Sequence, residues 1–81
     1  LNLDNPNIRK AYILLRLLCS SNYIDPYEFA DELSISPSLL RQTIKGLVPT
    51  LDKYNLQIDH HHNKGYKIAG EENDIRQCLS K

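Results

Sequence analysis

The sequence predicts a mainly α-helical domain that carries a small β-hairpin near its C-terminus. Apolar residues recur at spacings of three and four through the first two thirds of the chain, which is the period of helices packed on one face. Two later segments alternate apolar and polar residues, which is the period of a strand. The 81 residues suffice for one small domain with a modest core.

The first helix is expected from residue 7 to about residue 20. Asn5 can cap it, and Pro6 suits its first turn. The residues expected on its buried face are Ile8, Ala11, Tyr12, Leu15, Leu18 and Cys19. On that face, Cys19 is expected to be a core residue rather than a nucleophile.

Two shorter helices follow, and both have the same start signal. Asp25 and Ser36 can each cap a helix whose first position is a proline. The second helix should end near Leu33, and Glu28 completes a capping-box spacing with Asp25. Its expected core residues are Phe29, Ala30 and Leu33, while its exposed side is acidic.

The third helix has one apolar stripe at spacings of four, three and four. The stripe consists of Leu40, Ile44, Leu47 and Leu51. Pro49 interrupts the helix, so we expect a break near Val48, with helix resuming to about Tyr54. We expect the first three stripe residues to pack against Ile8, Tyr12, Leu15 and Phe29.

The hairpin is expected from residues 56–59 and 66–69, with a polar turn at residues 60–65. Residues 71–81 predict a last helix with Ile75 and Leu79 facing inward, or the start of a linker to a following regulatory domain. The predicted domain therefore comprises residues 1–70. The chain has no methionine, so we expect it to be part of a longer protein.

The composition excludes several classes of function. The net charge is zero, which is unusual for a nucleic-acid-binding domain, but residues 36–67 carry five basic and two acidic residues. The two cysteines form no CxxC motif, so we expect no disulfide scaffold, no zinc site and a reducing cytoplasm. No apolar run is long enough to span a membrane. No enzymatic activity and no cofactor are expected.

The second and third helices, joined by residues 34–36, have the spacing of a helix-turn-helix unit. In such a unit the second helix places its first turns in the DNA major groove. With the apolar stripe facing the core, the opposite face can offer an arginine to guanine and a glutamine to adenine. The predicted DNA contacts on this helix are Ser36, Ser38, Arg41, Gln42 and Lys45. Spacing alone is equally compatible with a solvated polar face.

Three helices followed by a two-stranded ribbon make a winged helix-turn-helix, with a three-helix core and the ribbon as its wing. The wing can lie along the sugar-phosphate backbone or enter the minor groove, and its predicted DNA contacts are His62, Asn63, Lys64 and Lys67. The hairpin can also close the core through Leu56, Ile58, Tyr66 and Ile68, and both roles are compatible. The run of three histidines is expected to be a solvated wing tip rather than a metal site, and its charge near pH 6 can favour DNA.

Four runs resemble the helix-turn-helix modules of BglG-type, PRD-containing bacterial regulators, such as Mga-like and mannitol- or lichenan-operon activators. They are FADELSISPSLLRQTIKGL, YNLQI, NKGYKIAG and EENDIR. The resemblance extends from about Ile8 to Leu79, and GYKIAGEENDIR is its most specific part. It implies that the residues after Ser36 form the DNA-reading helix, and that Gly65 and Tyr66 begin the second wing strand. The chain departs from the pattern at Thr43, where an acidic residue is common, and at Pro49, where helix normally continues.

The sequence therefore predicts sequence-specific binding of double-stranded DNA by a cytoplasmic transcription regulator. The resemblance implies that the regulated operons concern carbohydrates taken up by the phosphotransferase system. A homodimer is expected, formed through domains absent from this chain. The alternative is a winged-helix module for protein–protein interaction or dimerisation, which the neutral net charge favours. An antiterminator role in RNA binding is less favoured, because those relatives bind RNA through a separate small β domain.

Overall fold

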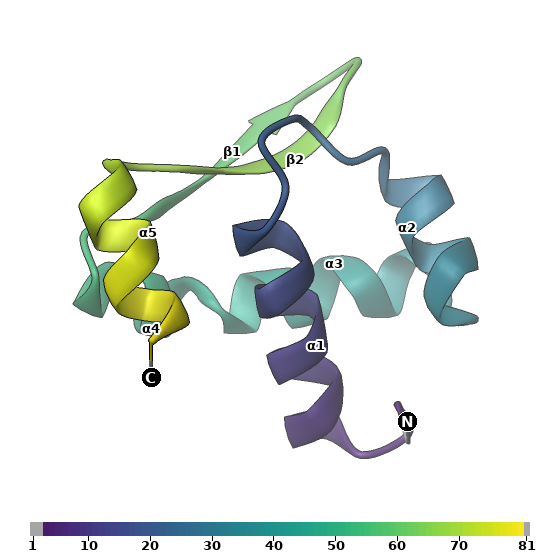
Figure 1. Ribbon diagram of the computed structural model, residues 1–81. Coiled ribbons are helices and arrows are strands. Elements are labelled where there is room, and N and C mark those ends of the chain that lie inside the picture. The colour runs from purple at the N-terminus through teal and green to yellow at the C-terminus, as the bar shows by residue number, and fades with distance from the viewer. Residues whose placement is uncertain (1–2, 81) are drawn as a thin grey trace.

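Figure 1 shows a computed structural model of the chain, which describes residues 3–80. Within this range the elements are α1 (Pro6–Leu18), α2 (Pro26–Leu33), α3 (Pro37–Gly46), α4 (Val48–Lys53), β1 (Gln57–His61), β2 (Gly65–Ala69) and α5 (Glu72–Leu79). Helix α3 lies across the middle of the molecule, with the hairpin on one side of it and the N-terminal half of α1 on the other (Figure 1). The predicted fold, a winged helix-turn-helix with mainly α structure, is confirmed.

The three predicted helix start signals are confirmed. Asn5 Oδ1 accepts hydrogen bonds from the backbone N–H groups of Asn7 (2.9 Å) and Ile8 (3.4 Å). Asp25 caps α2 and Ser36 caps α3 in the same way, with Ser36 Oγ accepting from the Leu39 N–H at 3.0 Å. Each cap satisfies a backbone donor that has no partner inside its helix.

The predicted break at Pro49 is also confirmed. Helix α3 ends at Gly46, and α4 begins at Val48. Leu47 between them keeps helical dihedral angles, and its N–H donates to the Ile44 carbonyl at 3.0 Å. Proline has no N–H and its ring clashes with the carbonyl four residues earlier, so the α-helical hydrogen-bond ladder cannot pass through position 49.

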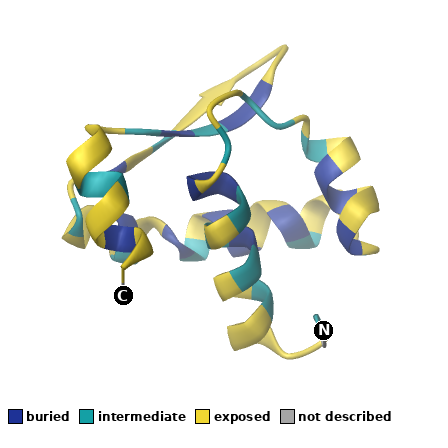
Figure 2. Cartoon of the chain, in the orientation of Figure 1, coloured by how far each residue is buried: buried dark blue, intermediate teal, exposed yellow. Residues whose placement is uncertain are grey.

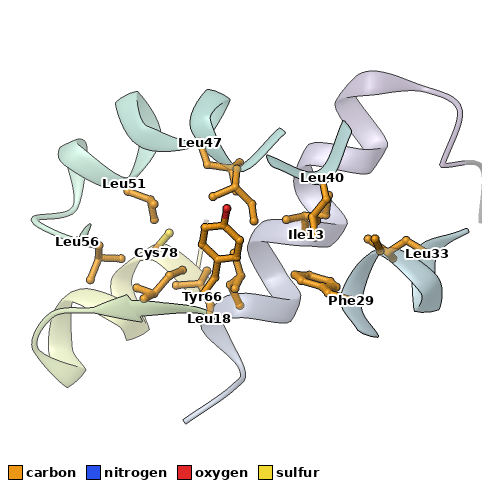
Figure 3. Packing of buried hydrophobic residues seen from close by; sticks show 14 residues of the cluster. Ile13, Leu18, Phe29, Leu33, Leu40, Leu47, Leu51, Leu56, Tyr66 and Cys78 are labelled. Atoms are coloured by element: carbon orange, nitrogen blue, oxygen red, sulfur yellow. The ribbon is translucent and has the colours of Figure 1, made fainter. Parts of the chain in front are cut away.

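One apolar core joins the helices to the hairpin (Figures 2 and 3). Its buried members are Ile13, Leu17, Leu18, Phe29, Ala30, Leu33, Leu40, Ile44, Leu47, Leu51, Leu56, Tyr66, Ile68 and Cys78. The predicted stripe on α3 and α4 and the predicted core of α2 are all in this set. Figure 3 shows the Tyr66 ring between the helical residues and the hairpin, so the wing closes the core.

The predicted buried face of α1 is wrong for most of its residues. Ile8 is 38% exposed and Leu15 is 52% exposed, and Ala11 and Cys19 are exposed as well. Tyr12 is partly buried, Leu18 is buried, and the remaining buried positions of α1 are Ile13 and Leu17. Apolar residues lie all around this helix, so its period allows two faces, and packing against α3 and β2 selects one of them.

The hairpin is longer than predicted. β1 and β2 pair antiparallel, with Ile58 opposite Ile68 and His60 opposite Tyr66. His60 and His61 belong to β1 rather than to the turn, which comprises residues 62–64. Polar residues at an exposed strand end carry no alternating apolar signal, so the sequence pattern could not distinguish them from a loop.

A short third strand segment completes the sheet. The Ile24 N–H donates to the Tyr66 carbonyl at 2.8 Å, and the Tyr66 N–H donates to the Ile24 carbonyl at 3.0 Å. The connection between α1 and α2 is therefore tied to the free edge of β2. This bridge positions the N-terminus of α2 next to the wing.

The last helix packs on α1 at the end of the hairpin away from the turn (Figure 1). The prediction that Leu79 faces inward is wrong, because Leu79 is 41% exposed and Cys78 is buried in its place. Ile75 is partly buried against the core, as predicted. Burial raises the pKa of the Cys78 thiol. The last predicted residue of this helix, at position 81, lies outside the described residues.

Candidate nucleic-acid interface

The predicted reading face of α3 is exposed. Ser38, Arg41, Gln42 and Lys45 are all exposed, opposite the buried stripe of the same helix. Ser36 is also exposed, but it lies at the N-cap of α3, where its hydroxyl accepts a hydrogen bond from the Leu39 N–H. The helical period therefore assigned this face correctly.

A groove separates α3 from the hairpin. Two adjoining hollows in this groove are both lined by Arg41, His60 and Tyr66. One of them continues to Tyr27 and to His62 in the turn of the wing. Arg41 thus lies where α3, the wing and the start of α2 meet. The position next to both helix and wing makes Arg41 the central residue of the candidate site.

Tyr27 and His60 also line this groove, although sequence reasoning did not select them. The His60 ring stacks on the Tyr66 ring, with centroids 4.4 Å apart and planes inclined by 14°. Because Tyr66 is buried, the stack fixes His60 against the core side of the hairpin. Extending the strand alternation from Ile58 by two residues would have indicated His60.

Gln42 lies on the other flank of α3. It lines a hollow that is shared with Asn7 and Lys10 of α1. Consecutive residues of an α-helix point about 100° apart, which explains why Arg41 faces the wing while Gln42 faces α1. The reading face therefore has two differently lined sides.

The predicted wing residues also divide between two surfaces. His62 borders the groove with Arg41, whereas the Nζ atoms of Lys64 and Lys67 lie 5.7 Å and 5.5 Å from the centroid of the Tyr23 ring. Tyr23 precedes the Ile24 bridge, so this cluster is on the sheet face opposite the buried Tyr66. Asn63 is exposed in the turn between these surfaces, and its N–H donates to His61 Nδ1 at 3.1 Å.

Acidic groups near the site are engaged by other partners. The Tyr23 hydroxyl donates to Asp59 Oδ2 at 2.5 Å, and this hydrogen bond is the main reason why the pKa of Tyr23 is raised, with desolvation adding a smaller effect. The ion pairs within residues 3–80 join Arg16 to Glu32 and Arg76 to Glu72. Arg41 and Lys45 on α3 form no ion pair within residues 3–80, so their charge is available to a ligand. On the wing, Lys67 lies opposite Asp59 in the strand register, so part of its charge is offset.

Nearly all of the chain matches a known protein family. Residues 7–81 match the Mga helix-turn-helix domain. The chain belongs to the Mga helix-turn-helix family. This is a family of DNA-binding domains from transcription regulators and not a family of enzymes.

As a member of the Mga helix-turn-helix family, the chain is similar to a curated bacterial protein. It is 35% identical over 75 residues to the probable licABCH operon regulator of Bacillus subtilis strain 168. The match covers 93% of the chain and 12% of that protein. No solved structure matches the chain significantly. The resemblance inferred from the sequence, to Mga-like and PRD-containing regulators, is confirmed.

Two further findings concern metals and membranes. Among residues 3–80, no three His, Cys, Asp or Glu side chains are grouped so that they could hold a metal ion. Within the same range, no helix has the length and hydropathy needed to cross a bilayer.

Proposed function

We propose that this chain reads a specific sequence of double-stranded DNA for a bacterial transcription regulator of carbohydrate operons. The observation that carries the proposal is the position of Arg41, exposed and without an ion-pair partner in the described chain, between the reading helix and the wing. The assignment to carbohydrate operons is supported by the resemblance to PRD-containing regulators and by the relative's description as a licABCH operon regulator.

The residues of α3 have separate roles in this proposal. Arg41 forks onto the two acceptors of a guanine, and Gln42 pairs with an adenine or a phosphate nearby. Ser38 lies one turn earlier on the same face, and Lys45 one turn later contacts phosphate. The ten residues of α3 make a helix about 15 Å long, which is sufficient to present these side chains along the major groove.

The wing contacts the DNA backbone beside the reading helix. His62 and Asn63 approach from the turn, while Lys64 and Lys67 supply charge from the outer face of the sheet. We propose that the regulator acts in the cytoplasm as a homodimer whose contacts lie outside this chain. A two-fold dimer would read two half-sites about one helical turn apart.

The decisive experiment is a selection from a random duplex library with the wild type and Arg41→Ala in parallel. The wild type should enrich one motif, and Arg41→Ala should lose preference at one base position. On the selected motif the substitution should cost about 1–3 kcal/mol of binding free energy, and on random DNA only the smaller part that comes from charge. Arg76→Ala on α5 is the matched control, and it should enrich the wild-type motif.

If the chain and the full-length protein both enrich no motif, the DNA-reading proposal is wrong. The winged helix would then be a module for protein–protein interaction or dimerisation. If a motif appears and Arg41→Ala leaves every position unchanged, DNA reading stands and the role of Arg41 is wrong.

A further inference from the structure

We propose that Lys10 of α1 binds a DNA backbone phosphate on the flank of α3 opposite the wing. This inference rests on the DNA-reading function proposed above. It adds a contact outside the helix-turn-helix unit and the wing, and it assigns a role to Gly46.

The hollow beside Gln42 provides the position of this contact. Pro6, Asn7, Arg9 and Lys10 line it from α1, and Leu39, Gln42 and Thr43 line it from α3. The Arg9 guanidinium is directed to the Leu3 carbonyl, which Nη1 contacts at 2.9 Å. Thr43 is buried and directs its hydroxyl to the Leu39 carbonyl at 2.8 Å, so it offers no free group there. Lys10 and Gln42 are the exposed polar groups with the longest reach at the side of the reading face.

Gly46 allows the Lys10 side chain to lie along α3. A Cβ atom at Gly46 would be 3.2 Å from Lys10 Cε and 3.6 Å from Lys10 Nζ. The lysine stem therefore crosses the helix at a position that has no side chain. The ammonium group is held beside the last turn of α3, on the same flank as Gln42.

Lys10 is the exposed basic residue of α1, whereas Arg9 and Arg16 are partly buried and hydrogen-bonded within the protein. Helix α1 carries three basic residues and no acidic ones. Arg9 Nη1 donates to the Leu3 carbonyl at 2.9 Å, and Arg16 pairs with Glu32. Lys10 forms no ion pair within residues 3–80. Its charge therefore has no partner in the described part of the chain.

The two flanks of α3 match the two walls of a major groove. A helix that enters the groove has one phosphate backbone on each side, and charged contacts to both backbones fix its orientation. The hairpin lies on one side of α3, and the N-terminal half of α1 lies on the other (Figure 1). Because an ammonium on a flexible stem suits phosphate, Lys10 is placed to contact the backbone that the wing does not reach.

The test measures fluorescence anisotropy with two duplexes, the selected motif and a scrambled version, over a series of salt concentrations. Lys10→Gln keeps most of the stem and removes the charge. It should weaken binding to both duplexes by a similar factor, about three- to tenfold, and reduce the salt slope by roughly 0.9. Lys10→Arg should restore both values. Arg76→Gln, which removes a positive charge from α5, should leave the slope unchanged.

Gly46→Ala gives an independent check, because it retains the lysine. Gly46 has an ordinary helical backbone, so alanine should leave the melting temperature the same or higher. Its Cβ should shift the Lys10 stem by a few tenths of an ångström, so the loss of affinity for both duplexes should be smaller than that of Lys10→Gln, and a larger loss would contradict a contact made by the flexible ammonium group.

Lys10→Gln with the affinity and slope of the wild type would overturn the inference while leaving DNA reading intact. A loss confined to the selected motif would also overturn it, because Lys10 would then read a base. Failure of the wild type to bind either duplex at low salt would instead overturn the proposed function.

Discussion

Gly65→Ala should be strongly destabilising, because the wing is docked through backbone atoms at this position. Gly65 is buried and has φ +108°, a conformation that favours glycine. A Cβ atom at Gly65 would be 2.0 Å from the Ile24 carbonyl oxygen and 2.7 Å from its carbon. No rotamer change can relieve a clash with backbone atoms, so the connection between α1 and α2 would have to move away from β2.

The cost follows from what this movement breaks. The positive φ costs an alanine about 1–2 kcal/mol. Separating Ile24 from Tyr66 breaks two backbone hydrogen bonds, each with a net contribution of about 0.5–1.5 kcal/mol. The sum is about 2–5 kcal/mol, compared with a total stability of roughly 4–12 kcal/mol for a domain of this size. The melting temperature should fall by roughly 10 °C or more.

Thermal and urea denaturation followed by circular dichroism would measure this effect. Gly46→Ala is the matched control, since it makes the same chemical change at a helical position and should cost little or nothing. If Gly65→Ala stayed within about 0.5 kcal/mol of the wild type, the segment around Ile24 would not be docked on β2. The assignment of the groove beside Arg41 would then lose its support.

Two further predictions test the core and the outer face of the sheet. Leu47→Ala should lower the free energy of unfolding by about 2–5 kcal/mol, because Leu47 is buried. Leu15→Ala should lower it by less than about 1 kcal/mol, because Leu15 is half exposed. Equal losses in urea denaturation would contradict the observed packing of α1. The Tyr23 pKa should lie above its ordinary value near 10 and fall in Asp59→Ala, when tyrosinate absorbance is titrated against Tyr23→Phe. Because folding raises this pKa, the stabilisation by Tyr23 is present below pH 10 and is lost as the pH rises through the raised value. An Asp59→Ala titration identical to the wild type would show that the hydrogen bond does not hold the phenol.

The features that sequence predicted well are those with local causes. A capping side chain and a proline at the first helical position act within one turn, so Asp25 and Ser36 fixed the starts of α2 and α3. The break at Pro49 has an equally local cause in the missing N–H. The stripe of α3 was correctly assigned because its apolar residues are few and regularly spaced, so one face of the helix was favoured.

The features that sequence missed depend on partners distant in the chain. Helix α1 is apolar on nearly every side, so its own period could not distinguish Leu15 from Leu17 as a core residue. The pairing of Ile24 with Tyr66 joins segments about 40 residues apart and leaves no periodic pattern. His60 follows Ile58 in the strand alternation, but its stacking on the ring of Tyr66 across the hairpin could not be predicted from the sequence.

The candidate site shows the same division between local and distant causes. Helical spacing determines that Arg41 and Gln42 point outward, but it does not determine what lies beside each of them. The hairpin lies beside Arg41, and α1 lies beside Gln42. Both elements are held in these positions by packing in the apolar core. Lys10 could not be selected from sequence for this reason, because its relation to Gln42 arises only when α1 crosses α3.

The neutral net charge is compatible with phosphate binding because the charges are sorted in space. Glu32 and Glu72 neutralise arginines on α1 and α5, and Asp59 is engaged by the Tyr23 hydroxyl. The basic residues on both flanks of α3 form no ion pair within residues 3–80. Counterion release depends on the number of phosphates contacted and not on the total charge of the protein. A neutral domain with this arrangement should therefore bind duplex DNA with a steep salt dependence, to which each unpaired cation beside α3 contributes separately.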